Sequence, residues 1–317
     1  MKFFPIVLTV ALSAQETTFR ATVPVVLVPV TVTDSRGKLV DGLTHSDFTV
    51  TDNGRAVRLQ LDTSDTINVP VALIVAVQTN DLSAAALLKI QKVGAMIQPL
   101  ITGERGSAAL LAVDERVTVA QEFTRDPTAL TRAFQQLSPR RARTTVALDA
   151  VAHAVEMFRA RPGNERRVLL LIGESKDRGS AAALETVLEQ LQRENIQLYA
   201  ATYSVTRTQW TTKAADRPRQ SGGENDILAG LGELVRLGKV NTAEALALHT
   251  GGKNIGFATL RSLQGIVSRV GEELHGQYLL SFPASGPEGF HALTVQLLEA
   301  GKRTVAARQG YWAVASP

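Results

Sequence analysis

The chain has 317 residues, enough for two domains, and its 44% hydrophobic and 20% charged content is that of an ordinary globular protein. Its 34 basic and 30 acidic residues give a formal net charge of +4, too small an excess to indicate nucleic-acid binding. The chain has no cysteine, which excludes disulfide bonds, thiolate metal sites, a cysteine nucleophile and lipid attachment to cysteine.

The first 14 residues, MKFFPIVLTVALSA, have the pattern of a short secretory signal peptide. One lysine precedes an apolar run of roughly ten residues, and Ala11 and Ser13 could form the small pair before the cleavage point. The alternative is a buried N-terminal strand. The run is too short to span a membrane, and no later segment is long enough. We therefore expect an exported protein, periplasmic or extracellular, without a transmembrane segment.

The two ends of the chain, residues 20–66 and 276–317, are predicted to be β-structure. Their strand-like segments are VVLVPVTVTD (25–34), DFTVTD (47–52), RAVRLQLD (55–62), QYLLSF (277–282), FHALTVQLL (290–298) and RTVAARQGYW (303–312). Asn53-Gly54, between the second and third of these, is a strong hairpin signal. Because the β segments flank a different pattern on both sides, we expect one small sandwich built from both ends of the chain.

Residues 67–275 alternate between apolar runs and amphipathic helical patterns. The run PVALIVAV (70–77) is typical of a central parallel strand buried on both faces. Further strands are expected at 107–113, 116–123, 167–175, 196–203 and within 249–257, and helices at 82–99, 127–137, 145–159, 184–191, 227–236, 242–249 and 260–274. This alternation predicts an α/β fold, a doubly wound and mostly parallel sheet inserted into the sandwich. Residues 205–225 lack periodicity and are predicted to form a surface loop.

The order of these segments resembles that of von Willebrand factor A-type proteins, in particular exported bacterial proteins in which such a domain lies between β segments. The segments that carry the resemblance are VTVTDSRG (30–37), DGLTHSDFTVTDNG (41–54), FTRDPTALTRAFQQL (123–137), TTVALDAV (144–151), VLLLIGESKDRGS (168–180), ALALHTGG (245–252), QYLLSF (277–282) and ARQGYWA (307–313). No single segment is specific, but together they cover nearly all of the chain after the signal-like stretch. The resemblance implies a Rossmann-like A-type domain and a non-enzymatic, adhesion-type protein-binding function.

Domains of this family usually contain a metal-ion-dependent adhesion site, and the resemblance implies where it would lie. The family pattern is Asp-x-Ser-x-Ser after the first strand, a Thr before the third helix and an Asp after the fourth strand, which hold a divalent cation through oxygens. The corresponding residues here are Gln78, Asn80, Leu82, Thr145 and Glu174. Only one carboxylate remains, so we expect a degenerate site with no resident cofactor. The alternative is a weak Mg²⁺ or Mn²⁺ site with relaxed ligands.

Basic residues gather near the positions where the carboxylates are missing. In this fold type, the loops that follow the central strand, precede Thr145 and follow Glu174 meet at the carboxyl edge of the sheet. The predicted partner-binding face comprises Thr79, Asp81, Arg140, Arg141, Arg143, Lys176 and Arg178. We predict that it binds an acidic protein partner by Arg–carboxylate pairing without a metal ion. The alternative is an ordinary solvated basic loop.

Motifs of enzymes are incomplete in this sequence. GESKD (173–177) is close to the nucleophile elbow G-x-S-x-G but lacks the closing glycine, and no HGGG-like segment precedes it. QTNDLS (78–83) contains no glycine to cradle a phosphate, and the histidines lack metal-ligand spacing. We expect no enzymatic activity; the alternative is a serine hydrolase that uses Ser175, with His249 or His275 as base. The identity of the partner and the oligomeric state are left open.

Overall fold

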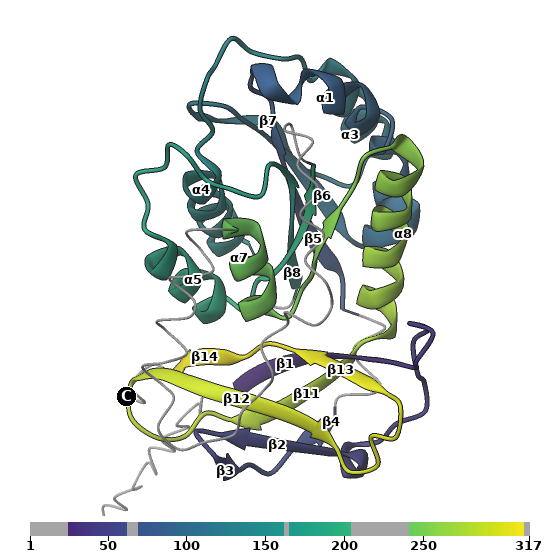
Figure 1. The fold of residues 1–317 in the computed structure, drawn as a ribbon, viewed down its shortest axis with the longest axis vertical. Helices are drawn as coiled ribbons and strands as arrows, with labels where there is room; N and C mark the ends of the chain where they lie inside the picture. Colours follow the sequence, from purple (N-terminus) through teal and green to yellow (C-terminus); the bar gives the residue numbers. More distant parts are fainter. Residues whose placement is uncertain (1–24, 62–68, 162–164, 204–240, 314–317) are drawn as a thin grey trace, which may run out of the picture.

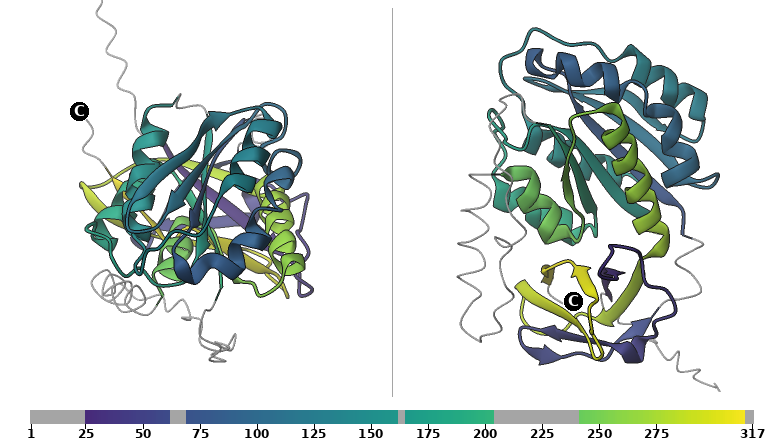
Figure 2. Two further views of the ribbon diagram at one scale, coloured as in Figure 1. Left: turned by 90° about the horizontal axis from the view of Figure 1, so that it is seen from above. Right: turned by 45° about the vertical axis from the view of Figure 1, so that its right-hand side comes forward.

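The computed structural model describes residues 25–61, 69–161, 165–203 and 241–313. An α/β domain lies on a smaller β-sandwich, and helix α8 (Leu260–Gly276) runs along the α/β sheet and leads directly into the sandwich (Figures 1 and 2). The predicted signal peptide, the loop at 205–225 and the helix at 227–236 lie outside the described residues. In the parts of the chain that the structure describes, every helix is too short or too polar to cross a lipid bilayer.

The α/β domain is built on a six-stranded sheet with the order β10-β9-β8-β5-β6-β7. The strands are β5 (Val71–Gln78), β6 (Ser107–Val113), β7 (Val117–Thr124), β8 (Arg166–Gly173), β9 (Gln197–Thr202) and β10 (Asn254–Gly256). All neighbours are parallel except β6 and β7, which are antiparallel. Every residue of β5 is buried, which confirms the predicted central strand.

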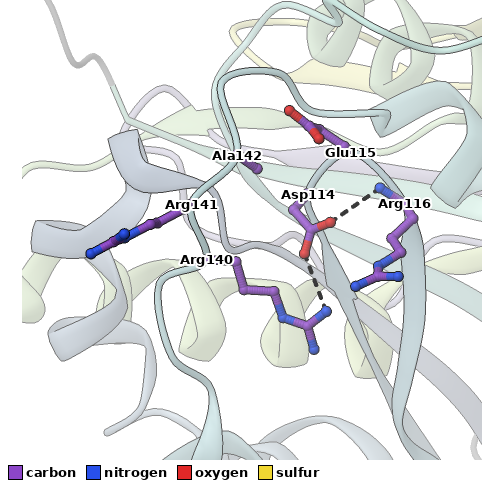
Figure 3. Close-up of a pocket in the computed structure, with 6 residues that line it drawn as sticks. All are labelled: Asp114, Glu115, Arg116, Arg140, Arg141 and Ala142. Atoms are coloured by element: carbon purple, nitrogen blue, oxygen red, sulfur yellow. Dashed lines mark hydrogen bonds and ion pairs between the residues drawn. The ribbon is translucent and has the colours of Figure 1, made fainter.

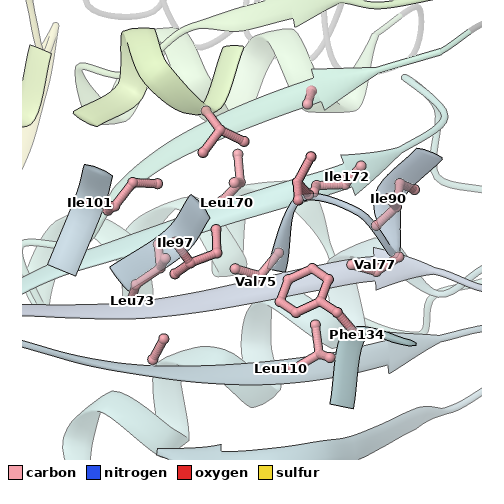
Figure 4. Packing of buried hydrophobic residues seen from close by; sticks show 14 of the residues in the cluster. Leu73, Val75, Val77, Ile90, Ile97, Ile101, Leu110, Phe134, Leu170 and Ile172 are labelled. Carbon is pink, nitrogen blue, oxygen red and sulfur yellow. The ribbon is translucent and has the colours of Figure 1, made fainter. Parts of the chain in front are cut away.

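Helices cover both faces of this sheet, as the doubly wound prediction requires. One face carries α1 (Ala84–Ile90), α2 (Gly94–Ile97), α3 (Pro127–Gln136) and α8, and the other α4 (Ala147–Arg159), α5 (Leu184–Arg193) and α7 (Thr242–Thr250). Alternate residues of β5 face opposite sides. Leu73, Val75 and Val77 pack with Ile97 and Phe134 on the first face (Figure 4).

The sandwich has two four-stranded sheets, in the orders β13-β1-β11-β4 and β14-β12-β2-β3. Its strands are β1 (Val25–Thr33), β2 (Phe48–Asp52), β3 (Arg55–Ala56), β4 (Gln60–Leu61), β11 (Tyr278–Pro283), β12 (Gly289–Leu297), β13 (Thr304–Ala307) and β14 (Gly310–Ala313), with a short 3-10 helix at His45–Asp47. Each sheet combines strands from both ends of the chain. The predicted insertion of the α/β domain into a sandwich is therefore confirmed.

Two predicted strands are each divided in the structure. The segment 55–62 forms β3 in one sheet and β4 in the other, and the segment 303–312 forms β13 and β14, which also lie in different sheets. The chain crosses between the sheets at both places. In the second crossing, Arg308 is buried and its Nε donates to the carbonyl of Gly310, which turns the chain between the two strands.

The predicted continuous helix at 82–99 is wrong. The segment forms a 3-10 turn (Asp81–Ser83), α1, α2 and a π-helical turn (Gln98–Thr102). Between α1 and α2 the N–H groups of Lys92 and Val93 donate to carbonyls three residues earlier, so the regular helical pattern is interrupted there. Pro99 lacks the N–H that a regular helix needs. Gly94, at the start of α2, allows close packing on Phe134, since a Cβ at this position would be 2.8 Å from the phenylalanine Cβ.

Candidate functional site

The carboxyl ends of β5, β6 and β8 and the loops that follow them form the carboxyl edge of the sheet, where ligands of such folds bind. Backbone hydrogen bonds join the loop after β5 to its neighbours. The N–H of Thr79 donates to the carbonyl of Val113 (2.8 Å), and the N–H of Arg140 donates to the carbonyl of Thr79 (2.7 Å). The structure therefore brings the segment after β5 together with the arginine-rich segment.

The side-chain amide of Gln78 links the ends of β5 and β8. Its Oε1 accepts a hydrogen bond from the backbone N–H of Glu174 (2.6 Å), and its Nε2 donates to Oδ1 of Asn80 (3.0 Å). Gln78 and Asn80 are 3% and 1% exposed. Two of the four residues predicted as metal ligands are thus hydrogen-bonded to each other.

Several buried polar atoms at this edge have no hydrogen-bond partner among the described residues. They are Thr79 Oγ1, Asn80 Nδ2, Asp114 Oδ2, Glu174 Oε2 and Tyr203 OH. Burial raises the pKa of Tyr203, and the nearby charge of Glu174 raises it further. The other carboxylate oxygen of Glu174 lies 4.0 Å from the guanidinium of Arg178. The ends of β5 and β8 therefore carry buried polar atoms, of which Glu174 supplies the charged group among the predicted metal ligands.

This set of donors does not fit a divalent cation. Both polar atoms of the Gln78 amide are already engaged, Asn80 Oδ1 accepts from Gln78, and Thr145 contributes one buried hydroxyl group. Glu174 is the one carboxylate among the four predicted ligands, whereas Mg²⁺ requires an octahedral set of oxygens. Within the described ranges, no group of three or more His, Cys, Asp or Glu side chains could hold a metal ion.

The arginine-rich segment lines a hollow of about 360 Å³ beside this edge, which we call the basic hollow (Figure 3). It is formed by Asp114, Glu115, Arg116, Arg140, Arg141 and Ala142. A guanidinium nitrogen of Arg140 lies 3.4 Å from Oδ2 of Asp114, whose Oδ1 accepts from the backbone N–H of Arg116 (3.1 Å). In Figure 3, the side chains of Arg116 and Arg140 extend to the same side of Asp114, whereas Arg141 points away.

The remaining residues of the predicted face do not line the hollow, and Thr79 is buried. Asp81 and Arg143 are exposed, and the N–H of Arg143 donates to Glu115 (3.3 Å). Lys176 and Arg178 are exposed in the loop after β8 and do not line the hollow. Between them, Asp177 points inward and accepts from the N–H of Leu148 at the start of α4 (3.3 Å), which fixes the loop.

Sequence reasoning missed Asp114, Glu115 and Arg116. They lie at the turn between the strands predicted at 107–113 and 116–123, where the sequence pattern indicates no functional residue. Because the strand at 107–113 is parallel to the central strand, its turn necessarily ends at the same carboxyl edge. An acidic pair followed by an arginine at such a turn could have indicated the hollow.

Ser175, the residue of the hydrolase alternative, is placed apart from both candidate bases. Its carbonyl accepts from the N–H of Ala243 at the beginning of α7. His249 lies near the other end of α7, and His275 follows Leu274, whose carbonyl accepts from Arg166 at the opposite end of β8. Within the described part of the chain, no histidine is hydrogen-bonded to Ser175.

No protein-family model matches this sequence, and a search of curated proteins gave no match. Among solved structures, the fold is similar to conserved hypothetical protein BatB from Bacteroides thetaiotaomicron, with 12% identity over 64% of this chain and 98% of that one and a TM-score of 0.46. It is also similar to a von Willebrand factor type A protein from Catenulispora acidiphila, with 10% identity over 93% of this chain and 76% of that one and a TM-score of 0.49. At these values the likeness concerns the fold alone and says nothing about function.

Proposed function

We propose that this chain, which has the von Willebrand factor A-type fold, is an exported, non-enzymatic interaction protein that binds an acidic protein partner through the basic hollow. The observation that supports the proposal is the pair of arginines in the hollow. Arg116 and Arg140 extend to the same side of Asp114, at the edge of the sheet where the loops after β5, β6 and β8 converge.

The chemistry of these arginines suits a carboxylate. A guanidinium group has five N–H donors in a planar fork. The contacts of Arg140 with Asp114 (3.4 Å) and with Oγ1 of Thr118 (3.4 Å) both use Nη1, so Nε and Nη2 are left for a ligand. Arg116 adds a second fork beside it, and Arg141 and Arg143 add exposed positive charge near the rim. A partner's Asp or Glu side chain would form charge-assisted hydrogen bonds here without a bridging cation.

The proposal can be tested with a fluorescently labelled peptide of alternating Glu and Leu residues. We expect its affinity to fall about tenfold in the double variant Arg116→Ala, Arg140→Ala, because losing even one charge-assisted hydrogen bond costs about 1.4 kcal/mol or more. Fluorescence anisotropy titrations would measure this, with thermal melts to confirm that the variant is folded. Affinity should also fall as salt rises, since the rim charges are exposed.

The matched control is the double variant Arg55→Ala, Arg58→Ala. These arginines are exposed in the sandwich, and their removal changes the net charge by the same amount. Equal affinity losses in the two double variants would show that peptide binding depends only on the net charge of the protein. The hollow would then not be the binding site.

The two alternatives make different predictions. A metal-dependent adhesion module with relaxed ligands would lose the peptide when a chelator is added and regain it with Mg²⁺ or Mn²⁺. A serine hydrolase using Ser175 would react with a fluorophosphonate probe, and Ser175→Ala would abolish the reaction. We expect neither result, because the metal-ligand positions carry a single carboxylate and Ser175 lacks a histidine partner in the described structure.

Export is part of the proposal and rests on residues 1–14. We expect the protein to be cleaved after Ala14 when it is expressed with its own N-terminus in a bacterium. N-terminal sequencing of the protein recovered outside the cytoplasm would measure this. An intact Met1 on all of the folded protein would contradict export by this route.

A further inference from the structure

We infer that the side-chain amide of Gln78 performs at this edge the cross-linking role that a bound cation would perform, so that the edge is assembled without any cation. The inference concerns the same edge as the proposed function. It does not depend on the identity of the partner, because it predicts stability and metal response rather than partner binding.

The orientation of the amide is fixed by a backbone group. The N–H of Glu174 can only donate, so the Gln78 atom that lies 2.6 Å from it must be the acceptor Oε1. Nε2 therefore faces Asn80 and donates to Oδ1 (3.0 Å). Asn80 in turn has its Nδ2 left without a hydrogen-bond partner among the described residues. One directed chain of hydrogen bonds thus runs from the end of β8 to the loop after β5.

This direction is the opposite of what a cation needs. A divalent cation requires several oxygen lone pairs directed at one point. Here the lone pairs of Oε1 and Oδ1 are directed at N–H groups, and the chain ends in an N–H₂ donor. A cation could recruit Oε1 only if the partly buried N–H of Glu174 lost its acceptor, which would cost stability.

Local packing is fitted to the amide. A Cβ on Gly173 would lie 2.7 Å from Oε1 of Gln78, so only glycine at the end of β8 allows this close approach. Ser83 donates through Oγ to the carbonyl of Asn80 (2.6 Å), which holds the loop that carries the second amide. Since Gln78, Asn80 and Ser83 are buried, water cannot readily substitute for the bonds among them. The partner-binding face is therefore held in place before any ligand arrives.

The first measurement uses the unaltered protein and needs no variant. Electron paramagnetic resonance of Mn²⁺ reports the free ion, and thermal melts with chelator, Mg²⁺ or Mn²⁺ report any stabilisation by mass action. We expect the free Mn²⁺ signal to equal that of a buffer blank and the melting midpoint to be the same in all three conditions. A saturable loss of the Mn²⁺ signal, or a midpoint raised by either metal, would overturn the inference.

The second measurement removes the amide. Gln78→Met keeps the size of the side chain but loses both hydrogen bonds, and we expect the midpoint to fall by about 5 °C because two buried polar groups lose their partners. Hydrogen exchange should show that the Glu174 amide has lost its protection. The control is Gln136→Met at the exposed end of α3. If the two variants have the same melting midpoint and the Glu174 amide stays protected from exchange, the cross-link does not exist.

Gln78→Glu keeps the inference testable if the methionine variant does not fold. It preserves an acceptor for the N–H of Glu174, replaces the donor to Asn80 by a second oxygen and adds a buried negative charge, so we expect the midpoint to fall while protection at Glu174 persists. Loss of protection at Glu174 in this folded variant would contradict the cross-link. The acidic-peptide assay is a separate readout, so loss of the proposed function and loss of this inference can be told apart.

Discussion

His249 is a titratable side chain whose charged form the fold excludes. It is 8% exposed, its Nδ1 has no hydrogen-bond partner in the described structure, and burial lowers its pKa from 6.5 to about 4. Between these two pH values the unfolded chain binds a proton that the native protein does not. The free energy of unfolding therefore falls as the pH falls, and His249 should contribute a loss of about 2–3 kcal/mol between pH 7 and pH 4.5.

Urea denaturation of the unaltered protein and of His249→Gln at the two pH values would measure this contribution. Carboxylates also titrate in this range, but they affect both proteins equally. We expect the stability of the glutamine variant to depend less on pH by the stated amount. If the free energy of unfolding falls by the same amount in both proteins between the two pH values, then His249 is not held neutral by burial.

The positions of single residues at the site were partly predictable. Gln78, Asn80 and Glu174 could be placed at the carboxyl edge because each lies at or close to the end of a recognisable strand. The hydrogen bond between Gln78 and Glu174 could not be predicted, because it depends on a side-chain conformation set by packing between residues 96 positions apart. The approach of Arg140 to Asp114 could not be predicted either, because it depends on how an irregular segment crosses the turn after β6.

At the scale of the element, two of the three glycines in helix α8 lie in contrasting environments. A Cβ on Gly271 would lie 2.1 Å from the carbonyl oxygen of Leu100 in the π-helical turn, whereas a Cβ on Gly265 would meet nothing within 4 Å. Alanine normally stabilises a helix by about 1 kcal/mol relative to glycine. We therefore expect Gly265→Ala to stabilise the protein by about 0.5–1 kcal/mol.

Gly271→Ala should lower the free energy of unfolding, because α8 would have to move away from the π-helical turn. We expect a loss of about 2 kcal/mol, in the range found for overpacked cores. Thermal or urea unfolding of the two variants side by side would measure both effects. A stabilised Gly271→Ala variant would mean that α8 does not approach Leu100 as closely as the structure places it.

Elements with a strong hydrophobic period were predicted well, and those shaped by tertiary contacts were not. The strands at 70–77 and 107–113 carry enough apolar residues to be recognised on their own. The segment 303–312 also alternates like one strand, but alternation cannot show that a chain leaves one sheet for another at Arg308. The helical pattern at 82–99 likewise cannot show that Gly94 packs closely on Phe134, far along the chain.

At the scale of the whole molecule, a buried polar network joins the α/β domain to the sandwich. Arg166 at the start of β8 donates to the carbonyl of Leu274 and to the side chain of Gln277 at the end of α8. Gln277 also donates to Oγ1 of Thr31 in the sandwich (2.8 Å) and to the hydroxyl of Tyr199 in the central sheet (3.3 Å). Because α8 leads straight into β11, the two parts share covalent and hydrogen-bonded connections and should unfold together.

Arg308 makes a second connection between the two parts, at the crossing from β13 to β14. Its guanidinium donates to the carbonyl of Leu27 in the sandwich (3.2 Å), and to the carbonyl of Gln192 (3.2 Å) and Oδ1 of Asn195 (3.0 Å) at the end of α5. It is 4% exposed, and burial lowers its pKa to about 10, which leaves it charged at neutral pH. The carboxyl end of a helix stabilises such a cation through its unpaired carbonyls.

Arg308→Met should therefore weaken the connection without removing side-chain volume. We expect a loss of about 2–4 kcal/mol, since several buried acceptors would lose a charged donor at once. In calorimetry, the single transition of the unaltered protein should broaden or split, because the sandwich and the α/β domain would no longer stabilise each other fully. Arg303→Met, at an exposed arginine of the same sandwich, is the control and should leave the transition unchanged. If Arg308→Met melts at the same midpoint and as sharply as this control, Arg308 does not couple the two parts, and cooperativity would rest on the network around Arg166 and Gln277 alone.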